Sequence, residues 1–422
     1  MMELIGCPAV AVLTCFYWVA SHLVLLLRVA LPRFSVIVRY GGRCVTPEGI
    51  CGGFASWIQS SRDYAKRTVG MWKSERLSRA VFHCTAILEG SILCRIRVSR
   101  KLSFCAFYVA GIVSIVLILI LMDGGYCSPI VEGMTVYSDG LNHSAVAFLV
   151  SYAGRPLLAF LMHCTVRLLE CLFLHRFRGG SDDCVTGFAA VAGCSFYVFA
   201  SCSSGVILPC TERSPLVIGG QRVVNGMTEA SPFFPTFALA VDALFVLHMV
   251  FQATQVYHHW VLAELRRKPD GTSVPKGEHC SVGRCKTTPK GVSEEGRIGD
   301  GSAVLYHFPR IALFKYVQEP HYACEVAMYA VNAISICLIV YNRSLPSGGT
   351  GREIGDEFSV GSEVVPLLCA TCLPPLGVLF FSLFNLAITA REHRRFWECV
   401  NARRGDGERE LIPKWDLFYG VW

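Results

Sequence analysis

Four groups of polar side chains lie beside long apolar runs of this 422-residue chain. Most members of a group stand three, four or seven residues apart, so an α-helix would place them on one face. Together the groups combine arginine and histidine donors with carboxylates and aromatic rings. They are Gln255, His259 and Arg266; Tyr306, His307, His321, Tyr322, Glu325 and Tyr329; Asn385, Thr389, His393 and Trp397; and His163, Arg167 and Glu170.

These residue types suit a bound nucleotide. Arginine makes charge-assisted and often bidentate hydrogen bonds to phosphate, and an aromatic side chain can stack on a flat ring. A pocket between helices could therefore hold a nucleotide with its reactive end toward the membrane. A basic belt whose long side chains reach the membrane surface and form internal salt bridges is the alternative interpretation.

The apolar runs that must position these groups are long enough to cross a membrane. The chain is 53% hydrophobic and only 17% charged, with a mean hydropathy of +0.44, whereas a soluble domain has about 25% charged residues. This composition excludes a soluble domain, a disordered chain, a coiled coil and a basic nucleic-acid-binding arm. Seven runs approach the roughly 20 residues that a bilayer requires: 8–27, 102–122, 144–162, 184–208, 234–257, 320–341 and 364–390. We therefore predict an all-α polytopic membrane bundle of about seven transmembrane helices.

Lysine and arginine alternate between the connecting segments. Segments 31–101, 163–183, 263–319 and 391–422 have 13, 3, 10 and 7 basic residues, whereas 123–143, 209–233 and 342–363 have 0, 2 and 2. The positive-inside rule then predicts a luminal N-terminus and a cytosolic C-terminus. Arg155 and Asp242 stand within predicted spans that enter from the lumen, and we expect them to form a structural ion pair.

The spans and loops divide the chain into four parts. Residues 1–101 hold the first span and a basic cytosolic segment, and 102–262 hold spans two to five. Residues 263–319 form a cytosolic loop with a Gly-, Lys- and Ser-rich insertion, and 320–422 hold the last two spans and a basic tail. We predict no metal site, because Cys369-x-x-Cys372 lies in an apolar run and Cys280-x4-Cys285 lacks a histidine pair.

The polar groups also carry a resemblance to a known family. Residues 305–329, LYHFPRIALFKYVQEPHYACEVAMY, resemble the C-terminal signature of the steroid 5α-reductase family and are closest to its polyprenal (polyprenol) reductase branch. His393-x-x-Phe396-Trp397, followed by Leu411-Ile412-Pro413, is similar to the ending of that family. The ends of the third and fifth spans and Arg39-Tyr40-Gly41 offer further matches. The chain departs from the family pattern at Gly42, His307, Trp397 and Arg404-Gly405.

The resemblance implies a multi-pass enzyme of the endoplasmic reticulum membrane that uses NADPH. Such an enzyme reduces a carbon–carbon double bond conjugated to a carbonyl, here the α-isoprene unit of polyprenal, on the way to dolichol for protein N-glycosylation. The substrate of such an enzyme is a long-chain isoprenoid from the membrane. The resemblance implies no nucleic-acid or protein partner. His163 and Tyr108 lie near the positions at which steroid reductases hold the ketone, and are the expected catalytic pair. The family pattern assigns ten residues to NADPH: Tyr40, Gln255, His259, Arg266, Tyr306, His307, His321, Glu325, His393 and Trp397.

Other functions fit parts of the same pattern. The lipid could be a 3-oxo steroid or an enoyl compound rather than polyprenal. An isoprenylcysteine-type methyltransferase would place S-adenosylmethionine in a similar C-terminal helical pocket and would transfer no hydride. A catalytically inactive membrane scaffold is the non-enzymatic alternative.

Overall fold

The protein is a bundle of long helices in a computed structural model. The structure describes residues 7–30, 91–123, 145–175, 177, 183–205, 234–265, 308–344, 360–402, 411–418 and 420. Within these ranges seven helices are long and apolar enough to cross a membrane. The predicted all-α polytopic membrane bundle is therefore confirmed. The long elements are α1 (Cys7–Ala30), α6 (Arg100–Asp123), α8 (Arg155–Leu169), α9 (Gly187–Gly205), α11 (Phe234–Leu265), α12 (Pro320–Ser344) and α13 (Val360–Ala402).

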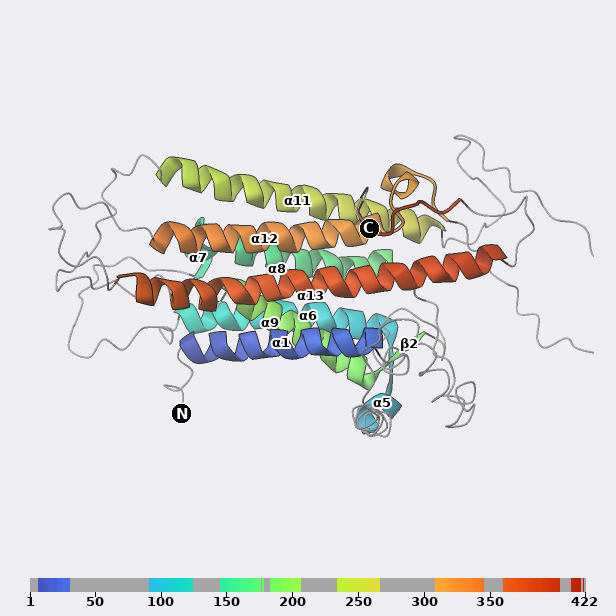
Figure 1. Ribbon diagram of the computed structural model, residues 1–422, viewed down its shortest axis with the longest axis horizontal. Coiled ribbons are helices and arrows are strands. Elements are labelled where there is room, and N and C mark those ends of the chain that lie inside the picture. Colours follow the sequence, from blue (N-terminus) through green and yellow to red (C-terminus); the bar gives the residue numbers. More distant parts are fainter. Residues whose placement is uncertain are drawn as a thin grey trace, which may run out of the picture.

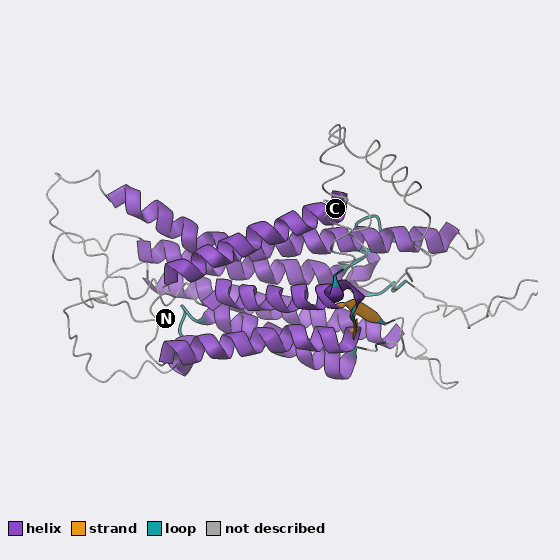
Figure 2. Cartoon of the chain, turned by 90° about the horizontal axis from the view of Figure 1, so that it is seen from below, coloured by secondary structure: helices purple, strands orange, loops and turns teal. Residues whose placement is uncertain are grey.

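The long helices lie side by side along one common axis (Figures 1 and 2). Ion pairs at one end of the bundle show which helix termini meet there: Arg28 contacts Glu392, Arg100 contacts Asp183, and His393 contacts Glu319. We call this the Arg100 end. It is the end that the distribution of basic residues predicts to be cytosolic.

Helix α12 lies at the centre of the bundle and packs against α11, α13 and α8. In the part of α12 that is apolar enough to span a membrane, 61% of the residues are buried. The corresponding part of α11 has 17% of its residues buried and presents most of its surface to the outside. Polar groups on α12 are therefore shielded from lipid by its neighbours, and such groups need partners inside the protein.

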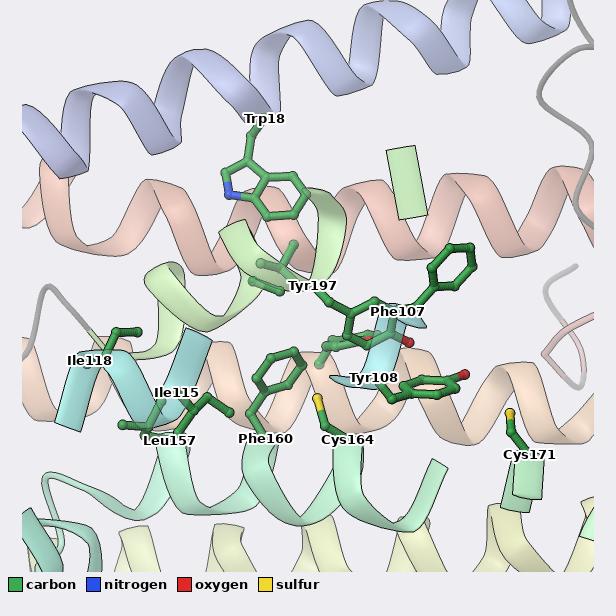
Figure 3. Close-up of a cluster of buried hydrophobic side chains, with 13 residues drawn as sticks. Trp18, Phe107, Tyr108, Ile115, Ile118, Leu157, Phe160, Cys164, Cys171 and Tyr197 are labelled. Atoms are coloured by element: carbon green, nitrogen blue, oxygen red, sulfur yellow. The ribbon is translucent and has the colours of Figure 1, made fainter. Parts of the chain in front are cut away.

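An aromatic core joins α1, α6, α8 and α9 (Figure 3). It includes Trp18, Phe107, Phe160 and Tyr197, all less than 9% exposed. Small residues permit close approach, as is common between membrane helices: a Cβ atom at Gly193 would clash with the ring of Phe107. This core fixes α6 and α8, which carry Tyr108 and His163.

The third span differs from the prediction. Residues 144–162 do not form one helix: the short helix α7 (Ala145–Val150) ends in a turn in which Gly154 N donates to Ser151 O (3.1 Å), and α8 begins at Arg155 with Pro156 in its first turn. A proline suits the first turn of a helix but not its interior. Arg155 therefore begins the span instead of lying within it, and it pairs with Asp242 at 3.1 Å, as predicted.

Short elements close the Arg100 end. Strand β1 (Arg97–Ser99) pairs antiparallel with β2 (Cys184–Thr186), next to the four-residue helix α5 (Ile92–Arg95). After the 3₁₀ turn η3 (Ala312–Lys315), the backbone of residues 317–319 pairs with that of Trp415 and Asp416. Asp416 in turn contacts Arg391 and Arg394 on α13. The C-terminal segment is thus attached to the start of α12.

Candidate functional site

Eight of the twelve site residues predicted from the sequence lie in the described part of the chain. Tyr40, Arg266, Tyr306 and His307 lie outside it. Seven of the eight stand where α6, α8, α11, α12 and α13 approach the Arg100 end: Tyr108, His163, Gln255, His259, His321, Glu325 and His393. The eighth, Trp397, belongs to a neighbouring apolar group.

Arg167 is the centre of the largest polar group, which we call the Arg167 cluster: Tyr108, Arg167, Glu170 and His259. Arg167 Nε donates to the Tyr108 hydroxyl at 3.1 Å, and its Nη1 atom contacts the Glu170 carboxylate. His259 Nδ1 lies 3.0 Å from both Glu170 oxygens and 2.7 Å from Arg167 Nη1. The imidazole can therefore donate to the carboxylate or accept from the guanidinium.

A π-helical turn positions Glu170. Helix α8 passes directly into η2 (Glu170–Leu174), where His175 N donates to Glu170 O at 2.7 Å. Single π-helical turns are rare and are frequent at functional sites. The wider turn begins at Glu170, one turn after Arg167, and both side chains are buried between helices. The sequence spacing predicted their shared face but not this change of helix type.

A second group of hydrogen bonds crosses from α12 to α8 through two glutamines of α11. Gln255 Nε2 donates to Glu325 Oε2 at 3.0 Å and to the backbone oxygen of His321 at 3.2 Å. Gln252 Nε2 lies 3.5 Å from Gln255 Oε1, and Gln252 Oε1 lies 2.8 Å from His163 Nδ1. Glu325 and His163 are thereby connected. No hydrogen bond joins His163 to Tyr108 among the described residues, and each has a different partner.

A third group lies at the start of α12. Glu319 accepts from His393 Nδ1 at 2.8 Å and lies 3.6 Å from His321 Nε2. Burial by itself raises the pKa of the Glu319 carboxyl, but the His393 and His321 imidazoles, with a hydrogen bond from Gln318, together leave the pKa below its usual value. The ring centres of His259 and His321 lie 5.0 Å apart, so this group continues into the Arg167 cluster.

The polar face of α13 is divided among three different neighbours. His393 faces Glu319, whereas Asn385 and Thr389 accept hydrogen bonds from Arg28 of α1 at 2.6 and 3.3 Å. Trp397 packs against Phe308, with ring centres 5.6 Å apart. The regular four-residue spacing of the sequence therefore does not correspond to one site.

Several buried polar atoms have no hydrogen-bond partner in the described ranges. They include His163 Nε2, His321 Nδ1 and the hydroxyl of Tyr329. Buried polar groups in proteins are nearly always paired, so an unpaired one is open to a water or to a polar group of a ligand. These three atoms come from α8 and α12 and lie around the polar groups described above.

The side chains of Glu170, His175 and His259 could also approach one cation, since their ligand atoms lie within 4.8 Å of one another. However, the Arg167 guanidinium already contacts both Glu170 and His259. A cation there would face an adjacent positive charge, and the arrangement favours the internal ion pair.

Two residues of these groups were not predicted from the sequence: Gln252 and Glu319. Gln252 continues the polar face of α11 by one turn toward its middle, at three residues from Gln255 and seven from His259. Extending the stripe into the apolar run would have found it. Glu319 directly precedes α12, and only its contact with His393 on another helix marks it.

Comparison with protein-family models, curated proteins and solved structures finds no match to this chain.

Proposed function

We propose that this protein is a membrane reductase of the endoplasmic reticulum that uses NADPH to saturate the α-isoprene double bond of polyprenal, a step toward dolichol and protein N-glycosylation. One observation supports the proposal above all: a connected set of His, Gln, Glu and Arg side chains is buried inside an otherwise apolar bundle. These side chains stand on the same segments as the sequence resemblance to polyprenal reductases.

The side chains at the Arg100 end of the bundle suit a nicotinamide nucleotide. Gln255, His259, His321, Glu325 and His393 offer donors and acceptors of the kinds that a carboxamide and ribose hydroxyls require. The unpaired Nδ1 atom of His321 fits a polar ligand at this place. Trp397 and the residues outside the described ranges, Tyr40, Arg266, Tyr306 and His307, complete the proposed NADPH set. NADPH, when bound, supplies the hydride.

The protein's own part is to orient the reactants, exclude water and stabilise charge on the substrate oxygen. Charge grows on the carbonyl oxygen as the conjugated double bond is reduced, and a fixed hydrogen-bond donor in a site without water stabilises it strongly. His163 and Tyr108 are buried and lie deeper in the bundle than His393. They are the candidates that the sequence offers for the substrate side of the site.

The apolar exterior suits a substrate with a long isoprenoid tail. Helices α1, α6 and α11 expose large aliphatic and aromatic side chains along most of their length. Such surfaces face lipid in a membrane, and an isoprenoid chain has the same chemistry as that lipid. We propose that the tail stays in the bilayer while the aldehyde enters the polar interior.

The decisive experiment is expression in cells that lack polyprenal reduction, followed by mass spectrometry of their isoprenoids. The proposal expects a gain of two hydrogens in the α-isoprene unit. Unchanged α-unsaturated lipid, with the protein present and inserted, contradicts it. Glu325→Gln and His393→Ala should abolish the gain, whereas the exposed-site variant Tyr341→Phe should not.

Cofactor choice separates the reductase from a methyltransferase. We expect NADPH, and not S-adenosylmethionine, to raise the melting temperature of the detergent-solubilised protein, and His321→Ala to remove that increase. Stabilisation by S-adenosylmethionine alone would contradict the proposal.

A further inference from the structure

The two glutamines of α11 have a fixed orientation. Gln255 Nε2 faces two acceptors, a Glu325 oxygen at 3.0 Å and the His321 backbone oxygen at 3.2 Å. A backbone oxygen can only accept, so the amide nitrogen of Gln255 must be on this side and its oxygen on the other. Gln252 must then turn its own nitrogen toward Gln255 Oε1.

This orientation determines which nitrogen of His163 carries the proton. Gln252 presents its oxygen to His163 Nδ1 at 2.8 Å, so Nδ1 donates and is protonated. In the neutral imidazole the other nitrogen, Nε2, then has a lone pair. His163 Nε2 is buried without a partner. It can accept a hydrogen bond but cannot donate one to a carbonyl oxygen.

The nearby Tyr329 carries a hydroxyl, which can donate a hydrogen bond to a carbonyl oxygen. It lies one turn after Glu325 on α12 and is 4% exposed, and its hydroxyl makes no hydrogen bond of good geometry among the described residues, although the Tyr197 side chain lies near it. Its ring centre lies 5.8 Å from that of His163. The Tyr108 hydroxyl accepts from Arg167 and keeps its own proton to donate, but Tyr108 does not border the void described next. Tyr329 is the buried donor that lies beside both His163 and that void.

Tyr329 also borders a small void between α8, α9, α12 and α13. The void measures about 10 Å³, which is roughly the space of one water. Phe160, Ala333 and Val378 form apolar parts of its wall, and the amide of Asn332, another lining residue, already donates to Ser204 at 3.2 Å. The α13 wall contains Pro375, which follows Pro374. A proline inside a helix removes a backbone hydrogen bond and weakens the helix there, so we expect this wall to yield when a larger group enters.

We propose that Tyr329 donates the hydrogen bond that stabilises the carbonyl oxygen of the substrate, a role for which His163 Nε2, which carries a lone pair, is unsuited. The inference rests on the proposed reductase function and assigns the oxygen-binding role to a residue outside the pair expected from the sequence. A carbonyl oxygen is an acceptor only, so it pairs with the tyrosine and not with the lone pair of His163.

The first test is Tyr329→Phe, with Tyr341→Phe on the exposed face of the same helix as the matched control. Loss of one such donor lowers the turnover of other enzymes by about 10²–10³-fold. We expect a fall of about 10²-fold in kcat with farnesal, a short α,β-unsaturated isoprenoid aldehyde, and no change in the stabilisation of the protein by NADPH. Full turnover in Tyr329→Phe overturns the inference.

The second test does not depend on turnover. Farnesal labelled with ¹³C at its carbonyl is bound without NADPH, and its carbonyl stretch is measured by infrared difference spectroscopy. A hydrogen bond lowers this frequency in the wild type, and the lowering should vanish in Tyr329→Phe. Incorporation of 3-fluorotyrosine at position 329, which preserves the shape of the residue and strengthens the donor, should lower the frequency further.

The outcomes separate the two proposals. If the wild type reduces farnesal but the carbonyl band is the same with Tyr, Phe and 3-fluorotyrosine at position 329, Tyr329 is not the donor and the reductase function stands. If the wild type neither binds nor reduces the aldehyde, the proposed function fails, and the role of Tyr329 fails with it.

Discussion

Two arginines inside the bundle have different surroundings. Arg28 of α1 contacts Asn385, Thr389 and Glu392, which all belong to α13, and we call this group the Arg28 cluster. Arg167 of α8 contacts Tyr108 on α6, Glu170 on η2 and His259 on α11. The first group joins two helices, whereas the second joins three long helices and η2.

The chemistry of the partners separates the two clusters further. The Arg28 cluster contains an amide, a hydroxyl and one carboxylate, and it leaves only the Nε atom of Arg28 itself unpaired. The Arg167 cluster adds a phenol and an imidazole, and it adjoins His163, His321 and Tyr329, each with an unpaired atom. A buried arginine alone therefore does not distinguish the two clusters. Their titratable neighbours, and the unpaired atoms of those neighbours, do.

Removal of Arg167 should have the largest effect. Arg167→Leu leaves Glu170, whose side chain is 4% exposed, without its nearest cation. Breaking a buried ion pair in this way costs about 3–5 kcal/mol. We expect a correspondingly lower free energy of unfolding in detergent and loss of reduction. The double variant Arg167→Leu/Glu170→Leu should recover part of the stability. Wild-type stability in the single variant would contradict the role of Arg167.

The matched variant Arg28→Leu should cost less. The carboxylate that it leaves behind, Glu392, is 19% exposed and can reach water or lipid head groups. Loss of charged hydrogen bonds of this kind costs about 1.5–3 kcal/mol. We expect lower stability but unchanged kcat in the folded fraction. A fall in kcat as large as that of Arg167→Leu would erase the distinction between the two clusters.

The Glu319–His393 pair should make stability depend on pH. The pKa of Glu319 lies below its usual value of 4.5, so the folded protein favours the ionised carboxylate. Its contribution is complete above pH 4.5 and is lost as the pH falls through the lower, folded-state value. The difference in melting temperature between wild type and Glu319→Gln should therefore shrink on acidification below pH 4.5. A constant difference would show that the charge of Glu319 is not involved.

The pair between Arg155 and Asp242 should contribute least. Their side chains are 28% and 51% exposed, and exposed pairs contribute about 0.2–1 kcal/mol. A double-mutant cycle with Arg155→Met and Asp242→Asn should give a coupling energy in that range and no effect on kcat. A coupling as large as that of Arg167 with Glu170 would mean that exposure does not separate these pairs.

Much of the site follows from the sequence because its residues lie on regular helices. The spacing of Gln255 and His259, and that of His321 and Glu325, predicts shared faces, and both pairs do lie toward the interior. The prediction was less accurate where local backbone geometry intervenes. The turn before Arg155 moves the third span, and the regular stripe Asn385, Thr389, His393 and Trp397 divides among three different environments.

The sequence by itself determined a seven-helix membrane bundle, because its seven apolar runs match the length of about 20 residues that a bilayer requires and the chain has few charges to solvate a soluble surface. It also determined which helix faces are polar, since helical periodicity is a local property. Only the tertiary structure decided which polar faces meet, that the amides of Gln252 and Gln255 orient His163, and that the Tyr329 hydroxyl lies buried beside His163 without a hydrogen bond of good geometry. Hydrogen bonding between distant residues depends on how the helices pack, and no local pattern encodes it.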